Sequence, residues 1–267
     1  MTVSENLCRK IEEIIKAAGE IVMKGAEKLK DSEVHTKGDA NFVTEYDISV
    51  QHFLEEKLSQ AVPEATFLAE EEGESENGLS SGLTFIIDPI DGTANFMYSV
   101  GHSAISVALA ENGKPIFGAV YNPYTDEYFY AVKGSGAYCN SKRIFCSERT
   151  GEAAIIAFGS SPYYKKTLGK QTAKLLYDLM CNFGDIRRYG AAALDLCYVA
   201  AGRFDAFCEA RLSPWDFAAG SLIVTEAGGT MSDFDGGELD YGKAGSVLAS
   251  SAAVYGEMFR ITRDFDK

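Results

Sequence analysis

Residues Phe85 to Phe96 read FIIDPIDGTANF, and the fold and the site can both be worked out from this stretch. Its apolar residues predict a buried strand that ends at Asp88, because Pro89 lacks the N–H that the next sheet hydrogen bond requires. Asp88 and Asp91 then bring two carboxylates close together, with no Lys or Arg within seven residues of either. Taken alone, Asp-Pro and Asp-Gly are common turn sequences, because Asp bonds to nearby backbone and Gly accepts a positive φ.

A pair of carboxylates at the end of a buried strand requires a counter-charge. Two unit charges about 4 Å apart repel each other by about 4 kcal/mol at an effective dielectric constant of about 20. A cation would turn this repulsion into a binding site, and hard oxygen ligands suit Mg²⁺. The stretch therefore indicates either a simple turn or a magnesium site, and the rest of the sequence must decide between them.

The composition is that of an acidic globular protein. The chain has 267 residues, with 25 Lys and Arg against 39 Asp and Glu, which gives a formal charge of −14. This length forms one large domain or two closely packed lobes. The charge argues against nucleic acid as a partner, because such binding depends on clustered Lys and Arg. It also means that any phosphate site must supply its own positive charge.

The sequence predicts a cytoplasmic protein that does not enter a membrane. The N-terminal segment mixes acidic and basic residues through its apolar positions, which is typical of a helix and not of a secretory signal. The longest apolar run, AISVALA, is far shorter than the roughly 20 residues that span a bilayer. The six cysteines are scattered without a C-x-x-C pair, as expected for reduced thiols in the cytosol.

The first part of the chain predicts two helices and then a run of strands. Apolar residues at helical spacing indicate one helix after Ser4, the expected N-cap, and a second from about Asp47 to Pro63. The strands TFLAE and LTFIID come next. An antiparallel series separated by Asn-Gly, Asn-Pro and Gly turns follows over residues 102–111, 114–123, 126–134 and 136–140.

Strands alternate with helices in the second part of the chain. The composition changes near residues 147–152, so we expect an N-terminal lobe of residues 1–146 and a C-terminal lobe of residues 147–267. The C-terminal lobe should contain the strands AAIIAFG, FDAFCE and SVLASS, and helices over residues 171–181, 191–202, 215–227 and from about 252.

Further acidic residues lie at the ends of other predicted elements. Glu70, Glu71 and Glu72 follow the strand ATFLA, and Asp216 lies at the start of the helix WDFAAGSLIVTEAGG. Alone, the three glutamates are typical of a solvated loop, and Asp216 is a first-turn acid favoured by the helix dipole. Only the combination of these acids with the Asp88 stretch distinguishes a metal site from an ordinary loop and an ordinary helix cap.

Two motifs carry a resemblance to a known family. DPIDGTANF, at residues 88–96, and WDFAAGSLIVTEAGG, at residues 215–229, closely resemble the two signature motifs of the inositol monophosphatase family of Mg²⁺-dependent, lithium-sensitive phosphomonoesterases. DANFVTEYD, FLAEEE and YGAAALDLCYVAAGRFDAFCE are similar to other segments of that family, so the resemblance covers nearly the whole chain. It implies a mixed α/β fold, a layered α-β-α-β-α sandwich shared with fructose-1,6-bisphosphatase, and a homodimer.

The resemblance also implies the ligands of two Mg²⁺ ions. Glu70, Asp88 and the backbone carbonyl of Ile90 should hold the first ion. Asp88, Asp91 and Asp216 should hold the second, with Asp88 bridging the two, and some members of the family bind a third, weaker ion near Glu70. Four carboxylates bring a charge of about −4 and two ions about +4, so the loaded site could accept a phosphate dianion.

The remaining implied roles concern the water and the substrate. Thr93 and Asp47 should orient the attacking water, with Asp47 acting through the threonine hydroxyl and Glu70 through the activating ion. The backbone amides of Gly92 and Thr93 should meet phosphate oxygens at the start of a helix. The positions that match substrate contacts in the family are Asp91, Gly190, Ala191, Ala192 and Glu209. Such a hydrolase requires no Ser-His pair, which agrees with a chain of three histidines, none at a matched position.

The sequence departs from the family pattern at two positions. Ala191 stands where Ser or Thr is common, so one hydrogen bond to the substrate is expected to be missing. Ala69 replaces the usual glycine before the paired glutamates. Arg211, close behind Glu209, has two readings: it reaches a second anionic group, or it pairs with a local acid on the surface.

These residues predict a phosphoric monoester hydrolase that acts on inositol 1-phosphate or a similar sugar or polyol phosphate. Two alternatives stay open. Relatives with the same metal core act on fructose 1,6-bisphosphate, histidinol phosphate, NADP or 3′-phosphoadenosine phosphates, and Glu209 favours a polyol hydroxyl over these. The second alternative is a regulatory protein that keeps the fold as a binding scaffold. The site should lie between the two lobes, because both halves of the chain contribute ligands.

Overall fold

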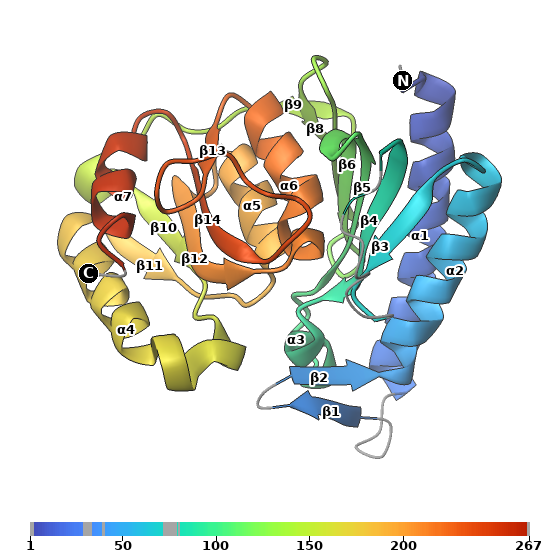
Figure 1. Cartoon of the computed structure of the whole chain (residues 1–267), viewed down its shortest axis with the longest axis horizontal. Helices are drawn as coiled ribbons and strands as arrows, with labels where there is room; N and C mark the ends of the chain where they lie inside the picture. Colours follow the sequence, from blue (N-terminus) through green and yellow to red (C-terminus); the bar gives the residue numbers. More distant parts are fainter. Residues whose placement is uncertain (1–2, 29–33, 39–40, 72–78, 80, 266–267) are drawn as a thin grey trace.

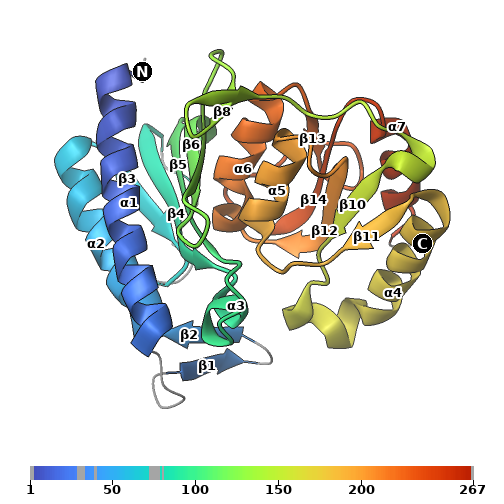
Figure 2. The ribbon, with the colours of Figure 1, turned by 180° about the vertical axis from the view of Figure 1, so that it is seen from behind.

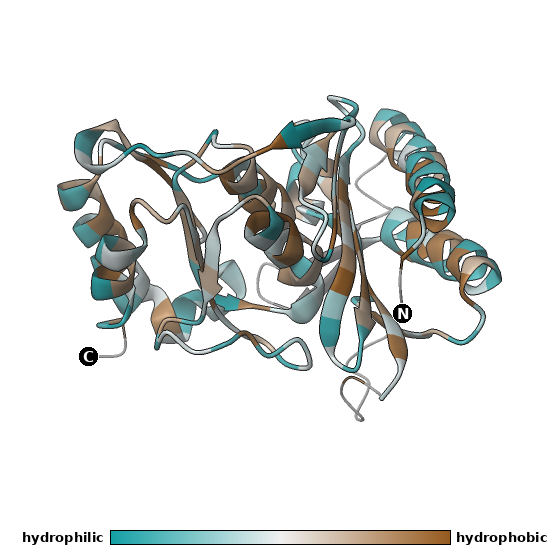
Figure 3. Cartoon of the chain, turned by 90° about the horizontal axis from the view of Figure 1, so that it is seen from above, coloured by the Kyte–Doolittle hydropathy of each residue, from teal (hydrophilic) through white to brown (hydrophobic). Residues whose placement is uncertain are grey.

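The structure is a computed structural model that describes residues 3–28, 34–38, 41–71, 79 and 81–265. Figure 1 shows five layers in the order helices, sheet, helices, sheet, helices, so the expected α-β-α-β-α sandwich is confirmed. Apolar residues lie on the sheets and on the layer between them, whereas the outward side of the N-terminal helices is hydrophilic (Figure 3). Within the described residues, no helix combines the length and the apolar character needed to cross a membrane.

The first layer consists of α1 (Glu5–Lys28) and α2 (Glu45–Ala61). Ser4 caps α1 as predicted, since its hydroxyl accepts a hydrogen bond from the N–H of Leu7. The second helix begins two residues before Asp47, because Thr44 caps it in a reciprocal box with the Asp47 side chain. The short pair β1 (Val34–Gly38) and β2 (Asn41–Thr44) precedes α2 and was not expected in a segment rich in turn residues.

The second layer is a seven-stranded sheet whose spatial order follows the sequence, β3-β4-β5-β6-β7-β8-β9. β3 is parallel to β4, and all the other pairs are antiparallel. The predicted antiparallel series is therefore confirmed, with one further short strand at its end. The strands are β3 (Thr66–Ala69), β4 (Leu83–Asp91), β5 (Ala104–Glu111), β6 (Lys114–Asn122), β7 (Glu127–Val132), β8 (Ala137–Cys139) and β9 (Lys142–Ile144).

The prediction that the FIID strand stops at Asp88 is wrong. β4 continues through Pro89 to Asp91, and its register against β5 shifts between Asp88, which faces Ser106, and Asp91, which faces Ala104. Pro89 is tolerated because it falls in this irregularity, where no regular ladder hydrogen bond is required of it. The bulge also re-aims the end of the strand, so that both aspartates belong to one continuous element.

The middle layer comes from the second part of the chain. It consists of α5 (Ala192–Ala200) and α6 (Pro214–Glu226), most of whose residues are buried. α6 approaches the sheet so closely that a Cβ atom at Gly118 of β6 would lie 2.6 Å from the carbonyl oxygen of Ala219. One apolar cluster joins residues of both sheets to these two helices. The two parts of the chain therefore share a core.

The fourth layer is a five-stranded sheet in the order β11-β10-β12-β14-β13, and α4 and α7 cover its outer face (Figures 1 and 2). The predicted strands correspond to β10, β12 and β14, while the three-residue strands β11 and β13 were not expected. α4 starts six residues earlier than predicted, at Lys165 instead of Gln171. The elements are β10 (Ile155–Phe158), α4 (Lys165–Asn182), β11 (Asp185–Arg187), β12 (Ala206–Leu212), β13 (Thr230–Ser232), β14 (Gly245–Ser250) and α7 (Tyr255–Thr262).

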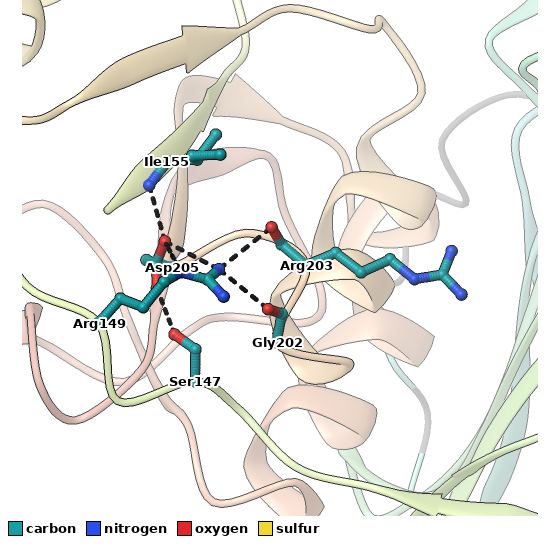
Figure 4. Close-up of polar contacts among 6 residues, drawn as sticks. All are labelled: Ser147, Arg149, Ile155, Gly202, Arg203 and Asp205. Atoms are coloured by element: carbon teal, nitrogen blue, oxygen red, sulfur yellow. Dashed lines mark hydrogen bonds and ion pairs between the residues drawn. The ribbon is translucent and has the colours of Figure 1, made fainter. Parts of the chain in front are cut away.

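Residues 147–155, which connect the two sheets, are held by hydrogen bonds to Asp205, a fully buried carboxylate at the start of β12 (Figure 4). It accepts hydrogen bonds from the N–H of Ile155 at 2.7 Å, from the Arg149 guanidinium at 3.1 and 3.2 Å, and from the Ser147 hydroxyl. Arg149 also donates to the carbonyl of Gly202 at 2.9 Å. The predicted boundary between residues 1–146 and 147–267 falls in this anchored segment, and it remains our proposal for the division into lobes.

Candidate active site

A cavity of about 410 Å³ opens where the end of β4 meets the second part of the chain. Most of the residues that the sequence singled out line it. These are Glu70, Asp88, Ile90, Asp91, Gly92, Thr93, Gly190, Ala192, Glu209 and Asp216. Asp47 and Ala191 are completely buried and do not line the cavity. Residues up to 146 places apart thus converge on one hollow (70 to 216).

Three carboxylates form the centre of the site. Asp88, Asp91 and Asp216 each offer an oxygen within 4.8 Å of the others, and Asp88 and Asp91 are buried. Burial, followed by the charges of Glu70, Asp91 and Asp216, raises the pKa of Asp88 well above its ordinary value. A cluster of acids that destabilise one another in this way, made only of hard oxygen donors, fits a divalent cation such as Mg²⁺.

Glu70 reaches the same cavity because of the strand arrangement. β3 and β4 are parallel and paired, with Ala69 facing Ile87, so the residues that follow each strand meet at one edge of the sheet. The charge of Glu70 raises the pKa of both Asp88 and Asp216. The replacement of the family's glycine by Ala69 therefore leaves Glu70 at the cavity, beside the cluster of three aspartates.

Ile90 contributes through its backbone. Its N–H donates to Asp88 Oδ1 at 3.0 Å, a local bond that fixes the aspartate side chain against the turn. Its carbonyl oxygen accepts from the Thr93 hydroxyl at 3.1 Å, and the residue lines the cavity. The predicted carbonyl ligand thus lies between Asp88 and Asp91 in the bulged end of β4.

Asp91 also caps a helix from the other half of the chain. Its two oxygens accept from the N–H groups of Ala192 at 3.2 Å and Ala193 at 2.7 Å, at the start of α5. Ala191, the N-cap residue of α5, provides no side-chain cap, so Asp91 satisfies these groups instead. Burial raises the pKa of Asp91 to about 7, although the backbone hydrogen bonds from Ala193 and Ala192 oppose this.

Asp216 performs the structural role that its sequence position suggests, in addition to joining the cluster. Its carboxylate accepts from the N–H of Ser213 at 2.7 Å, because Asp216 is the third residue of α6 and forms a capping box with Ser213. Burial and the charges of Asp91 and Glu70 raise the pKa of Asp216 well above its ordinary value, against the effect of the Ser213 hydrogen bond. The Asp216 side chain can therefore cap α6 and belong to the acidic cluster at the same time.

Thr93 and Asp47 lie together, as the family resemblance implies. The Thr93 hydroxyl lies 3.2 Å from Asp47 Oδ1, and Asp47 Oδ2 accepts from the N–H of Thr44 at 2.8 Å and from its hydroxyl at 2.5 Å. Burial raises the pKa of Asp47 to about 6, against the hydrogen bonds from Thr44. Thr93 lines the cavity and Asp47 lies behind it, so the hydroxyl is the hydrogen-bonding link between this carboxylate and the cavity.

Only glycine fits at position 92 without strain. It has a φ of 86° as the N-cap of the short helix α3 (Thr93–Met97). A Cβ atom there would lie 3.1 Å from the carbonyl oxygen of Gly190 and 3.2 Å from that of His102. Gly92 therefore allows the end of β4 to approach the loop before α5, where Gly190 lines the cavity.

Glu209 forms the wall of the cavity on β12. It is 7% exposed, and its Oε1 accepts from the N–H of Ser161 at 2.7 Å. Burial raises the pKa of Glu209 to about 7, against the Ser161 hydrogen bond and the charge of Arg188. Gly159 leaves room for the side chain, since a Cβ atom there would overlap the Glu209 carboxylate.

The sequence did not identify several other residues that line the cavity. Tyr163 and Tyr164 come from the turn before α4, and Asp195 comes from α5. Asp195 is 1% exposed, and its Oδ1 has no hydrogen-bond partner in the part of the chain that the structure describes. The sequence SSPYY, which directly follows a strand that ends near Glu209, was the available signal for the tyrosines. For Asp195, inside an apolar helix, there was none.

Comparison with known proteins agrees with this geometry. Residues 5–265 match the model of the inositol monophosphatase family. The chain is 38% identical to the Nus factor SuhB of Escherichia coli K12 over 248 residues, which are 92% of each protein. It is also 38% identical to the inositol-1-monophosphatase of Rhizobium meliloti over 238 residues, 89% of this chain and 88% of the relative.

Solved structures give the same result for the fold. The extragenic suppressor protein SuhB of Bartonella henselae aligns with a TM-score of 0.89 at 34% identity, over 97% of this chain and 99% of that one. The inositol monophosphatase of Thermotoga maritima aligns with a TM-score of 0.87 at 32% identity, over 98% of each chain. The expected fold type is thereby confirmed, and the chain belongs to the inositol monophosphatase family.

Proposed function

We propose that the protein hydrolyses a sugar or polyol phosphomonoester, with inositol 1-phosphate as its main substrate, in a reaction that depends on Mg²⁺. The observation that carries this proposal is the set of three carboxylates within 4.8 Å of one another in a cavity that Glu70 also lines. The chain belongs to the inositol monophosphatase family, and one relative at 38% identity carries the name inositol-1-monophosphatase.

Glu70, Asp88 and the carbonyl of Ile90 would hold the first ion, and Asp88, Asp91 and Asp216 the second, with a third, weaker ion near Glu70. When bound, Mg²⁺ lowers the pKa of a ligated water, polarises the phosphoryl group and stabilises the leaving oxygen. The four carboxylates would offset the charge of two such ions, and three of them already lie within 4.8 Å of one another. Lithium sensitivity is proposed on the family resemblance alone.

Thr93 and Asp47 would orient the attacking water. The Thr93 hydroxyl has one proton and lies between two acceptors, Asp47 Oδ1 at 3.2 Å and the Ile90 carbonyl at 3.1 Å. Whichever acceptor takes the proton, the hydroxyl oxygen keeps its lone pairs, one of which can accept a hydrogen bond from water in the cavity. The N–H groups of Gly92 and Thr93 would bind oxygens of the transferred phosphate.

The opposite side of the cavity would bind the alcohol part of the substrate. Glu209 is held by Ser161 and is positioned to accept a hydrogen bond from a hydroxyl, and Gly190 and Ala192 leave space beside it. Ala191 is fully buried and does not line the cavity. The hydroxyl of a Ser or Thr at this position would therefore lie behind the cavity wall and not at its surface. A polyol is the class of alcohol that uses such an acceptor.

A regulatory function is the second candidate, because relatives at 36 and 38% identity carry the name Nus factor SuhB. The acidic cluster is retained in this chain, which supports catalysis over a scaffold that has lost its chemistry. We also propose a homodimer in the cytoplasm that does not bind nucleic acid or membranes, in line with the formal charge of −14.

The test is phosphate release by the purified protein with Mg²⁺ from a panel of inositol 1-phosphate, fructose 1,6-bisphosphate, histidinol phosphate, NADP and 3′-phosphoadenosine phosphate. We expect the highest kcat/KM with inositol 1-phosphate. Hydrolysis of none of these by a protein that melts cooperatively would overturn the enzymatic proposal and leave the regulatory one. A clear preference for another member of the panel would overturn only the choice of substrate.

A further inference from the structure

Arg211 is a cation at the cavity that the proposed reaction does not use. It lies on β12 two residues after Glu209, is exposed, and lines the same cavity as the acidic cluster. The sequence left two readings for it, a contact with a second anion or a pair with a local acid. No ion pair involves Arg211 within the described residues, and its guanidinium lies 5.6 Å from the centre of the Tyr164 ring. Within the described residues, the geometry therefore favours the first reading.

The chain is built to hold this arginine against the tyrosine. Ser161 adopts a φ of 43°, a left-handed conformation that is uncommon for a residue other than glycine. Its N–H donates to Glu209 at 2.7 Å, and its hydroxyl accepts from the N–H of Arg211 at 3.1 Å. The N–H of Tyr164 then donates to the carbonyl of Ser161 at 2.9 Å. The turn is thus fastened to β12 at both Glu209 and Arg211, and it carries Tyr164 to the guanidinium.

The other arginine of the cavity is already occupied. Arg188 donates to the Ser160 hydroxyl at 3.2 Å, and its charge acts on the buried carboxylates of Glu209 and Asp195. Nothing comparable balances Arg211 in the described part of the chain. An arginine whose plane is supported by an aromatic ring presents a fixed fork of N–H donors, which matches the oxygens of a phosphate or a carboxylate.

The position of Arg211 assigns this anion to the alcohol part of the substrate. Thr93, which would hold the water, belongs to α3 in the half of the molecule that contains the seven-stranded sheet, whereas Arg211 and Tyr164 belong to the other half (Figures 1 and 2). In an in-line displacement the water and the leaving oxygen lie on opposite sides of the phosphorus. A group that projects from the leaving alcohol would therefore point away from Thr93 and toward Arg211.

We propose that Arg211, supported by Tyr164, binds a second anionic group on the leaving alcohol, so that the cavity accepts sugar or polyol phosphates with two anionic groups as well as inositol 1-phosphate. This inference rests on the proposed function. Water adds to the scissile phosphorus, the P–O bond to the alcohol breaks, the alcohol gains a proton, and the second anionic group remains unchanged.

The test compares two substrates that differ only in the second phosphate, fructose 1,6-bisphosphate and fructose 1-phosphate, with wild type and Arg211→Gln. We expect the ratio of kcat/KM for the bisphosphate over the monophosphate to fall about tenfold in the variant, the size typical of a lost charged hydrogen bond. Arg263→Gln is the matched control, because Arg263 is also exposed, lies 5.8 Å from the Phe259 ring and does not line the cavity. Its ratio should equal that of the wild type.

An equal loss with both substrates would show that Arg211 serves the scissile phosphate, and an unchanged ratio would show that it binds no second anion; either result overturns the inference. Failure of the proposed function has a different signature, the absence of phosphate release from every substrate by the wild type. In that case equilibrium titration of both proteins with fructose 1,6-bisphosphate and Mg²⁺ decides the matter. Tighter binding by the wild type supports the role of Arg211, and equal binding overturns it.

Discussion

Asp91 Oδ2 accepts a hydrogen bond of 2.7 Å from the backbone N–H of Ala193, which lies 102 residues further along the chain. This bond gives a residue of the acidic cluster a second task, because it caps α5 from another layer of the fold. Asp88 has no comparable task within the described residues, since its hydrogen bond to Ile90 is local. The two aspartates therefore offer a way to separate chemistry from stability.

We predict that Asp88→Asn and Asp91→Asn both lower phosphate release by more than about 100-fold, because each removes a charged ligand from the cluster. Their stabilities should differ. The Asp88→Asn variant keeps an acceptor for Ile90 and relieves the repulsion among the acids, so without metal it should melt no lower than wild type. The Asp91→Asn variant replaces one of two required acceptors by a donor, which should cost about 1–2 kcal/mol of unfolding free energy. Chemical denaturation in chelator measures both, and equal stabilities would contradict the capping role.

Thr93→Ala should lower kcat by about 100-fold with little change in KM, because a misplaced water slows the chemical step more than it weakens substrate binding. Thr93→Ser keeps the hydroxyl between Asp47 and Ile90 and serves as the control, with most of the activity retained. A kcat for the alanine variant within a factor of about two of wild type would remove Thr93 from the reaction.

Gly159→Ala should disturb the cavity wall. A Cβ atom at this position would lie 2.6 Å from the Cβ of Glu209 and even closer to its carboxylate, so the glutamate or the strand must move. We expect a loss of about 1–3 kcal/mol in stability and a raised KM. Gly169→Ala provides the contrast, because the new Cβ in helix α4 would meet no atom within 4 Å beyond its chain neighbours and the backbone of its own helix, and alanine favours a helix by up to about 1 kcal/mol. Similar effects at both positions would exclude the Glu209 contact as the cause.

Glu209 should make the metal-free protein less stable as the pH rises. Burial raises its pKa from 4.5 to about 7 in the folded state, so the folded protein holds this proton more tightly than the unfolded chain does. The resulting stability is complete below about pH 4.5 and is lost by about pH 7, a change of about 3 kcal/mol at about 1.4 kcal/mol per pH unit. Glu209→Gln keeps the acceptor for Ser161 and removes the titration. Denaturation from pH 5 to pH 8 should therefore show a shallower decline in the variant, and parallel curves would count against the buried acid.

The sequence allowed prediction of those features that depend on local pattern. The apolar spacing of α1, the alternating strands between Asn-Gly turns, and the order of the two signature motifs led to the layered fold and to the acids around Asp88. The short strands β1, β2, β9, β11 and β13 could not be predicted, because three to five residues carry too little periodic signal. β4 extends three residues beyond the predicted end at Asp88, because a bulge accommodates Pro89.

Other features depend on contacts between distant residues, which one sequence does not reveal. Nothing in the local sequence indicates that Asp91 caps α5, or that Ser161 fastens its turn to Glu209 and Arg211. The partner of Arg211 was open for the same reason. Its charge was visible in the sequence, but the Tyr164 ring beneath it and the lack of an acid beside it in the described chain required coordinates.

The most direct test of the metal-dependent mechanism is phosphate release from inositol 1-phosphate by chelator-treated protein during a titration with Mg²⁺. We predict no release without the ion, a saturable rise as it is added, and a matching rise in melting temperature, because a ligand that binds only the folded state stabilises it. Undiminished release in excess chelator would contradict the claim that Glu70, Asp88, Asp91 and Asp216 act through bound Mg²⁺.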